Sequence, residues 1–234
     1  MVAAAAASAM PVPAGSSVTL AIDAATYEGS VAVFRAGVVV AERTVAMRGE
    51  TEERLMPAVI AALADAGCGV RDVKRVVCGE GPGSFTSLRI AGAIAKGIAF
   101  GNSVPLYAVS SLALIVAGAG DLEPGNYLAV LDAMRGERYC GLFARTADGT
   151  VRVLGPAQRV NADAIAELAR GKGATPIGPL EDVRCAPHAR GARAMLDQVS
   201  NGGDVSVDSW EPSYGRLAEA QVKWEAAHGR PLAP

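Results

Sequence analysis

The order of the predicted elements restricts the fold of this chain more than any other feature of its sequence. Three short apolar and β-branched runs, at 18–23, 30–34 and 38–47, are separated by glycine-containing turns and predict an antiparallel meander. Helical and strand patterns then alternate, with helices expected over 50–66, 85–100 and 110–119, and strands over 74–78 and 106–109. A meander followed by alternation predicts an α/β fold with a mixed sheet flanked by helices.

This element order is the ribonuclease-H-like pattern, and the second half of the chain repeats it in weaker form. Strand patterns at 127–131, 137–144 and 151–154 precede a helical pattern over 162–170. Asn161 is the expected N-cap of that helix, and Gly171 is its expected end. Two halves of this kind are expected to face each other across a cleft.

The predicted domain organisation is two lobes with a tail at each end. Residues 17–120 are expected to form an N-terminal ribonuclease-H-like lobe, and 121–234 a reduced C-terminal lobe. That second lobe ends in the turn-rich segment 201–215 and a short predicted helix over 216–228. Residues 1–16 are rich in alanine and are expected to form a flexible tail.

The sequence predicts a cytoplasmic protein with no membrane association. No basic residue precedes Arg35, so the apolar N-terminus lacks the positive region of a signal peptide. The longest later apolar stretch, 90–100, contains Lys96 and is too short to span a bilayer. The four cysteines show no CxxC spacing, which favours buried thiols in a reducing compartment over a disulfide framework.

Composition and missing motifs argue against several classes of function. A formal net charge of −2 and an aromatic content of 5% disfavour a module that binds tRNA by itself. Neither HExxH nor GxSxG occurs, and the two histidines, His188 and His228, are far apart in the sequence. A peptidase is therefore disfavoured, because the chain offers neither paired zinc ligands nor a nucleophile triad.

Two stretches could form a phosphate site. Asp23 follows a buried strand, and the turn GEGPGSFT at 79–86 joins a strand to a helix. Backbone N–H groups at a helix start bind anions, so Asp23, Gly81, Gly83 and Ser84 are the candidate nucleotide or phosphate cleft. The alternatives are an Asp that caps its own turn and a tight connection without ligand. An ATP-using enzyme acting through Asp23 and the 79–86 turn thus remains an open hypothesis.

The helix expected over 85–100 is unusually apolar. Its only charges are Arg89 and Lys96, seven residues apart and so on nearly the same face, while most other positions are small and apolar. Such a helix is either deeply buried or covered by another subunit. Gly92 and Gly97 weaken an isolated helix, which favours close packing of a partner there.

Several segments together resemble the TsaB (YeaZ) family, whose bacterial members act in the synthesis of threonylcarbamoyladenosine in tRNA. They are IDAAT…SVAV, TEERLMPAV, GEGPGSFTSLRIAGAIAKGIAFG, PLYAVSSL, LDAMRGERY and EPSYGRLAEAQ, and they span most of the chain after residue 17. The resemblance implies an ASKHA-type fold, with two ribonuclease-H-like lobes. It also implies a non-catalytic subunit that binds and activates the metal-bearing TsaD-like transferase, which adds threonylcarbamoyl to N6 of the adenosine next to the anticodon.

The resemblance also implies partners and a surface for them. A TsaE-like ATPase joins the pair, and tRNA is contacted only through the complex. A homodimer of the chain when alone is expected from its apolar helix face, because leaving that face exposed would risk aggregation. The helices that bind the TsaD-like partner match 51–66 and 85–100 in this chain. The implied interface residues are Leu55, Val59, Leu63, Arg89, Gly92, Ala93, Lys96 and Gly97.

No metal, cofactor or catalytic residue is expected. The catalytic paralogue carries two histidines after the strand that matches PLYAV, and the corresponding positions here are Ser111 and Ile115. An isoleucine cannot coordinate a metal. Two departures from the family pattern are Ala25, in place of a usual hydroxyl residue, and Glu50, in place of a common histidine. The first of these weakens the case for nucleotide binding.

Overall fold

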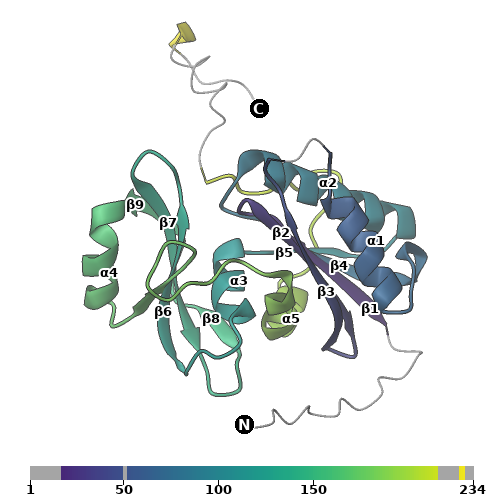
Figure 1. The fold of residues 1–234 in the computed structure, drawn as a ribbon, viewed down its shortest axis with the longest axis horizontal. Helices are drawn as coiled ribbons and strands as arrows, with labels where there is room; N and C mark the ends of the chain where they lie inside the picture. The colour runs from purple at the N-terminus through teal and green to yellow at the C-terminus, as the bar shows by residue number, and fades with distance from the viewer. Residues whose placement is uncertain (1–16, 50–51, 216–226, 230–234) are drawn as a thin grey trace.

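The protein was analysed as a computed structural model, which describes residues 17–49, 52–215 and 227–229 (Figure 1). Two helix-flanked β-sheets stand side by side with further helices between them. The predicted tail at 1–16 and most of the predicted helix at 216–228 lie outside the described residues.

The first sheet has the predicted ribonuclease-H-like order. Its strands follow one another as β3-β2-β1-β4-β5; β1, β2 and β3 pair antiparallel, whereas β4 and β5 add in parallel. The meander and the alternating segment are both confirmed. The strands are β1 (Val18–Asp23), β2 (Glu28–Arg35), β3 (Val38–Ala46), β4 (Val73–Gly79) and β5 (Leu106–Val109).

Both faces of the first sheet are buried, because alternate side chains of each strand point in opposite directions. Leu20 and Ile22 of β1 pack under the helices α1 (Leu55–Asp65) and α2 (Phe85–Asn102). Ala21, between them, belongs to the apolar cluster on the other face. Figure 1 shows α1 and α2 together on the side of this sheet that faces away from the second sheet.

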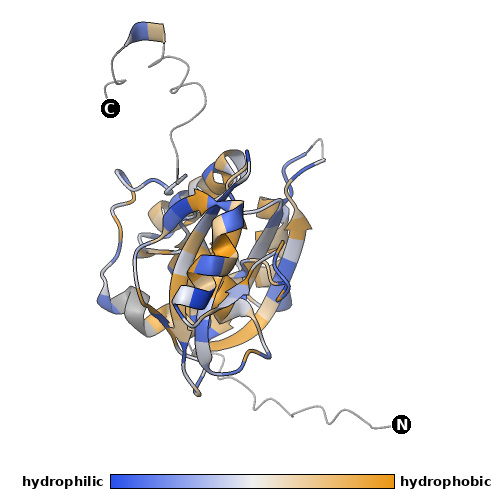
Figure 2. Ribbon diagram, turned by 90° about the vertical axis from the view of Figure 1, so that its left-hand side faces the viewer, coloured by the Kyte–Doolittle hydropathy of each residue, from blue (hydrophilic) through white to orange (hydrophobic). Residues whose placement is uncertain are grey.

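The second sheet repeats most of this order. It runs β10-β6-β7-β8, with β9 also paired to β7, and β10 is parallel to β6. The helix α4 (Ile165–Gly171), which follows the short 3₁₀ turn η2 (Ala162–Ala164), covers its outer face and alternates hydrophilic and hydrophobic residues (Figure 2). The strands are β6 (Gly125–Asp132), β7 (Glu137–Arg145), β8 (Val151–Val153), β9 (Gln158–Asn161) and β10 (Thr175–Ile177).

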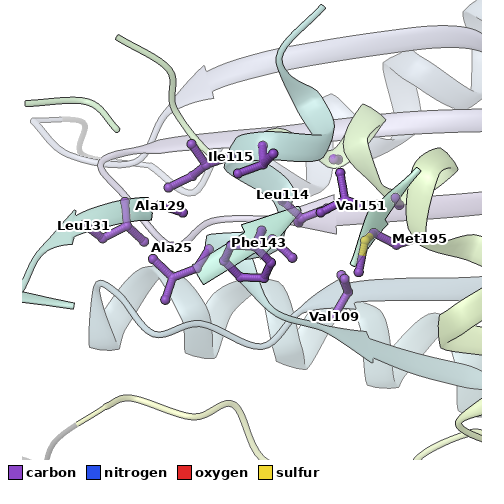
Figure 3. Packing of buried hydrophobic residues seen from close by; sticks show 14 of the residues in the cluster. Ala25, Val109, Leu114, Ile115, Ala129, Leu131, Phe143, Val151 and Met195 are labelled. Carbon is purple, nitrogen blue, oxygen red and sulfur yellow. The ribbon is translucent and has the colours of Figure 1, made fainter. Parts of the chain in front are cut away.

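The helix α3 (Ser111–Gly118) lies between the two sheets and is buried on all sides. Its apolar residues share one cluster with side chains of both sheets, among them Phe143 of β7 and Val109 of β5 (Figure 3). The 3₁₀ turn η3 (Ala189–Gly191) and the helix α5 (Ala192–Asn201) complete this layer. The two lobes therefore have a common core, and the chain forms the expected α/β fold of ASKHA type.

Several local expectations need correction. Helix α1 begins at Leu55 rather than at residue 50, because the Glu53 carboxylate accepts the Leu55 and Met56 amides and caps the first turn. The short strands β9 and β10 and the helix α5 were not predicted. The boundary between the lobes at 120/121 stays a prediction. Within the described part of the chain, no helix is long and apolar enough to cross a membrane.

Candidate functional site

Asp23 ends β1 with a fully buried side chain. Its Oδ1 accepts a hydrogen bond from the Ser111 hydroxyl at 2.5 Å, and its Oδ2 accepts one from the Ala25 amide at 3.1 Å. Burial raises the pKa of the Asp23 carboxyl, and these two hydrogen bonds oppose part of that rise. The Ser111 oxygen also accepts the Gly81 amide at 3.0 Å. Asp23 and Ser111 together thus connect β1, the glycine-rich turn and α3.

The glycines of the 79–86 turn allow close approach of backbone. Gly81 has φ of +94°, and a Cβ there would overlap the Ser213 carbonyl oxygen. A Cβ at Gly83 would overlap the Ala25 carbonyl, which accepts the Ser84 amide at 2.7 Å. Other parts of the same chain therefore fill the space next to both glycines. The structure does bring the four predicted cleft residues into one region, and it supplies internal contacts to each of them.

The space between the lobes at this point is apolar. Ala25 and Leu88 of the first lobe belong to one buried cluster with Leu131 and Tyr139 of the second (Figure 3 shows Ala25 and Leu131). A nucleotide placed between the lobes would have to displace these side chains. This arrangement matches the alternative in which the turn is a tight connection without a ligand.

Ser111 and Ile115, the positions implied to hold metal ligands in the paralogue, are both fully buried on α3. The Ser111 hydroxyl is hydrogen-bonded to the Asp23 carboxyl and the Gly81 amide, and Ile115 packs in the cluster between the sheets (Figure 3). Neither side chain offers a free coordinating atom. In the part of the chain that the structure describes, no group of three or more His, Cys, Asp or Glu is arranged to hold a metal ion.

The three implied interface residues on α1 are core residues. Leu55, Val59 and Leu63 are 0–1% exposed and pack on the first sheet. They occupy the apolar stripe that any amphipathic helix turns toward its sheet, so spacing alone could not assign them to a partner. The expectation that they form an exposed interface is wrong.

Three implied interface residues on α2 contact the chain itself. We name residues 205–215 the C-terminal strap, because this segment crosses α2. Lys96 donates from Nζ to the Trp210 carbonyl at 3.0 Å, and Arg89 donates from Nε to the Tyr214 hydroxyl at 3.3 Å. Gly92 lies under the strap, since a Cβ there would be 3.2 Å from Cγ of Pro212. Arg89, Gly92 and Lys96 are therefore not a free docking surface.

Further contacts fix the strap at both ends. The Val205 amide donates to the Leu106 carbonyl at 2.8 Å, and the Ser213 amide donates to the Glu80 carbonyl at 2.7 Å. The ring of Tyr214 lies 4.5 Å from that of Phe85, and its carbonyl accepts the Tyr139 hydroxyl. The strap thus joins α2 to both sheets.

An apolar surface remains on the far side of α2 and on the adjoining side of α1. Phe100 is 74% exposed and Ile60 is 47% exposed, and Ala93 and Gly97 are exposed between them in sequence. We name this surface the outer face; it consists of Met56, Ile60, Ala93, Ile94, Gly97 and Phe100. Ala93 and Gly97 were expected here from the sequence. The others were missed, although each is an apolar residue off the buried stripe of its helix.

A groove of about 360 Å³ runs between α1 and α2 within this surface. Its α2 wall is open at two glycines, because nothing lies within 4 Å of where a Cβ would stand at Gly97 or Gly101. Its lining residues are Met56, Val70, Arg71, Ala93, Ile94, Gly97, Ile98, Gly101 and Asn102.

Comparison with known proteins assigns this chain to a family. Residues 45–185 match the sequence model of the family described as TsaD, tRNA N6-adenosine threonylcarbamoyltransferase. The chain is 30% identical, over 88% of its own length and 96% of the relative's, to the tRNA threonylcarbamoyladenosine biosynthesis protein TsaB of Bacillus subtilis. The chain belongs to the TsaB (YeaZ) family.

Further relatives agree with this assignment. The Escherichia coli TsaB is 37% identical over 56% of this chain and 56% of its own. A solved structure described as YeaZ from Pseudomonas aeruginosa superposes with a TM-score of 0.70, at 26% identity, over 85% of this chain and 99% of that one. A second Pseudomonas aeruginosa structure, described as similar to peptidase YEAZ, has a TM-score of 0.73 and covers 86% and 100%. The similarity to TsaB and YeaZ thus extends over both lobes.

Proposed function

We propose that this chain is a non-catalytic subunit of the bacterial system that makes threonylcarbamoyladenosine in tRNA. It binds the metal-bearing TsaD-like transferase and keeps that partner active, a TsaE-like ATPase joins the pair, and tRNA is contacted through the complex. The pathway is supported by the relatives named tRNA threonylcarbamoyladenosine biosynthesis protein TsaB. In the absence of its partner, the chain pairs with a second copy.

The outer face of α1 and α2 is the observation that carries the proposal. Its apolar side chains come from two neighbouring helices, with Phe100 74% exposed and Ile60 47% exposed. Full burial of a side chain of this size contributes about 1.5–3 kcal/mol. A protein surface that covers both residues would therefore gain a substantial part of its affinity here, with Ala93 and Gly97 allowing the helices to approach closely.

The proposal that the chain is non-catalytic is supported by the internal contacts of the residues between the two lobes. Ser111 is hydrogen-bonded to both Asp23 and Gly81, and Ile115 is packed in apolar surroundings. These are the groups that an ASKHA enzyme acting through Asp23 and the 79–86 turn would need to turn toward a ligand. Their internal partners favour a structural role for this region.

Size-exclusion chromatography with light scattering tests the proposal. The chain would be run alone at tens of micromolar and then mixed with the TsaD-like protein of the same organism. We expect a homodimer that gives way to a one-to-one heterodimer. Failure of the two proteins to associate would contradict the proposal.

Two matched variants locate the interface. Ala93→Arg places a long charged side chain on the outer face, whereas Ala166→Arg makes the same change at an exposed position of α4 on the second lobe. We expect Ala93→Arg to abolish the heterodimer and Ala166→Arg to leave it unchanged. Equal binding by the two variants would place the interface elsewhere on the chain.

A further inference from the structure

The segment that precedes α5 fastens the second half of the chain to the first lobe. We name residues 185–191 the clasp; they lie between β10 and α5 and include η3. The Ala189 amide donates to Oγ of Ser30 on β2 at 2.9 Å. Arg190 donates from Nε to the Gly118 carbonyl, at the end of α3, at 2.8 Å. The clasp thus contacts a strand and a helix that both lie much earlier in the sequence.

An ion pair and close backbone packing complete these contacts. Nη1 of Arg190 lies 3.2 Å from Oε1 of Glu42 on β3. A Cβ on Gly191 would stand 2.6 Å from the Gly118 amide nitrogen, so the clasp backbone lies directly against the end of α3. Ala189 is buried in the cluster that α3 shares with both sheets. The position of η3 therefore affects the packing between the two sheets.

His188 is the N-cap of η3, and its ring holds the turn in place. Nδ1 of His188 accepts the Arg190 amide at 3.1 Å, and the His188 carbonyl accepts the Gly191 amide at 2.9 Å. Nδ1 can accept a hydrogen bond only in the neutral ring with its proton on Nε2, because both nitrogens of a protonated ring are donors. Protonation of Nδ1 therefore replaces this hydrogen bond with two N–H groups that face each other.

The surroundings of His188 favour its neutral form. Burial is the largest cause that lowers the pKa of His188 from its ordinary value of 6.5; the Arg190 guanidinium adds to this effect, and the Glu42 carboxylate on β3 opposes it. The sequence of α3 contains no titratable side chain. Burial raises the pKa of the Cys185 thiol, which lies near Arg190, so this group brings no charge to the clasp at neutral pH.

We infer that His188 is an acid-sensitive latch: its neutral ring holds the clasp against α3 and the first sheet, and protonation of Nδ1 releases the clasp. The closed clasp binds this proton less tightly than the open clasp does. The stabilisation is therefore complete above pH 6.5 and is lost as the pH falls below that value. A single proton favours opening by at most about tenfold for each pH unit.

Hydrogen exchange of backbone amides, followed by NMR on the full chain, tests the latch. Exchange rates at pH 7.5 and pH 5.5 would each be divided by the intrinsic rate of an unprotected amide at that pH. We expect protection of the Ala189 and Arg190 amides to fall about three- to tenfold between pH 7.5 and pH 5.5. The amides of β1 should stay more strongly protected than these two, which distinguishes opening of the clasp from unfolding of the whole chain.

Two variants of His188 separate the effect of the proton from that of the hydrogen bond. His188→Asn keeps an N-cap acceptor for the Arg190 amide but does not titrate, so protection of this amide should be the same at both pH values. His188→Ala has no acceptor and should show low protection at both. The matched control is His228→Asn, which changes the other histidine of the chain and should retain the pH dependence.

Three results would overturn the inference. Equal protection of the Arg190 amide at pH 7.5 and pH 5.5 in the unmodified chain would mean that acid does not release the clasp. A pH dependence that persists in His188→Asn would assign the effect to another titratable group. Clasp amides that exchange no faster than those of β1 at pH 5.5 would mean that acid acts on the whole fold. No partner protein is needed, so these results are independent of binding to the TsaD-like subunit.

Discussion

The Ser111 hydroxyl donates a hydrogen bond to Oδ1 of Asp23 at 2.5 Å and ties the last residue of β1 to the first residue of α3. Because Ser111 also accepts the Gly81 amide, one side chain holds together three segments that are far apart in the sequence. All three groups are buried, so water cannot replace a lost partner.

Ser111→Ala should destabilise the protein by about 1–3 kcal/mol, because it leaves the Gly81 amide and Oδ1 of Asp23 each without a buried partner. Urea denaturation measures this loss. Ser110→Ala is the control, since Ser110 is the neighbouring hydroxyl and its side chain makes no capping hydrogen bond to α3. A loss as large for Ser110→Ala as for Ser111→Ala would contradict the role of the network.

Asp23→Asn should make stability less dependent on pH. The pKa of the Asp23 carboxyl is raised in the folded state, chiefly by burial. The folded state therefore binds this proton more tightly, and its contribution to stability is lost as the pH rises from below 3.8, the ordinary value, through the folded pKa. Asparagine does not titrate, so the free energy of unfolding of Asp23→Asn should improve relative to the unmodified chain as the pH rises above 3.8.

Denaturation at several pH values checks this prediction. A constant difference between the two proteins across the range would mean that the Asp23 pKa is the same in the folded and unfolded states. A difference that moves against Asp23→Asn with rising pH would mean that the hydrogen bonds from Ser111 and Ala25 outweigh burial.

Gly92→Arg should displace the C-terminal strap, because its side chain needs the space that Pro212 and Trp210 occupy. In a Trp224→Phe background, Trp210 is the one tryptophan left, and its fluorescence should shift to longer wavelength as the strap leaves α2. Gly97→Arg is the matched variant on the open side of the same helix. It should leave the emission unchanged and stabilise α2 by roughly 1 kcal/mol.

Gly83→Ala should destabilise the chain by about 1–3 kcal/mol, because the added Cβ overlaps the Ala25 carbonyl and forces two backbone segments apart. Gly101→Ala is the control, since space is open at that position. Urea midpoints compare the two variants. If Gly83 instead serves to admit a phosphate, Gly83→Ala should keep its stability, and the unmodified chain should hydrolyse ATP above background.

The sequence is sufficient to predict the first sheet because its signals are local. Strands β1 and β5 have the bounds of the apolar runs that predicted them, and the glycine-rich turn before α2 is correctly placed. The burial of α3 was not predicted, although its residues are apolar at almost every position. A helix that is apolar all round indicates burial on all sides, and α3 fits that description better than α2 does.

The candidate site was only partly predictable from the sequence. The wrong predictions concern residues whose contacts are with segments far away in the sequence. Nothing in the spacing of Arg89 and Lys96 indicates that residues 210 and 214 of the same chain lie over them. The strap has few apolar residues and many turn formers, so local patterns indicate a loop and give no docking position. Helix α5, in contrast, has a local signal that could have predicted it, since Met195 and Leu196 lie at helical spacing from Ala192.

A helix buried between two sheets also determines how this molecule can move. Kinases and other two-lobed enzymes close around a ligand by rotating one lobe against the other, which requires an interface that can slide or part. Here such a rotation would break the packing of Leu114 and Ile115 against side chains of the two sheets. The two lobes should consequently melt together in one calorimetric transition, and whatever this protein does to a partner it does as a rigid body.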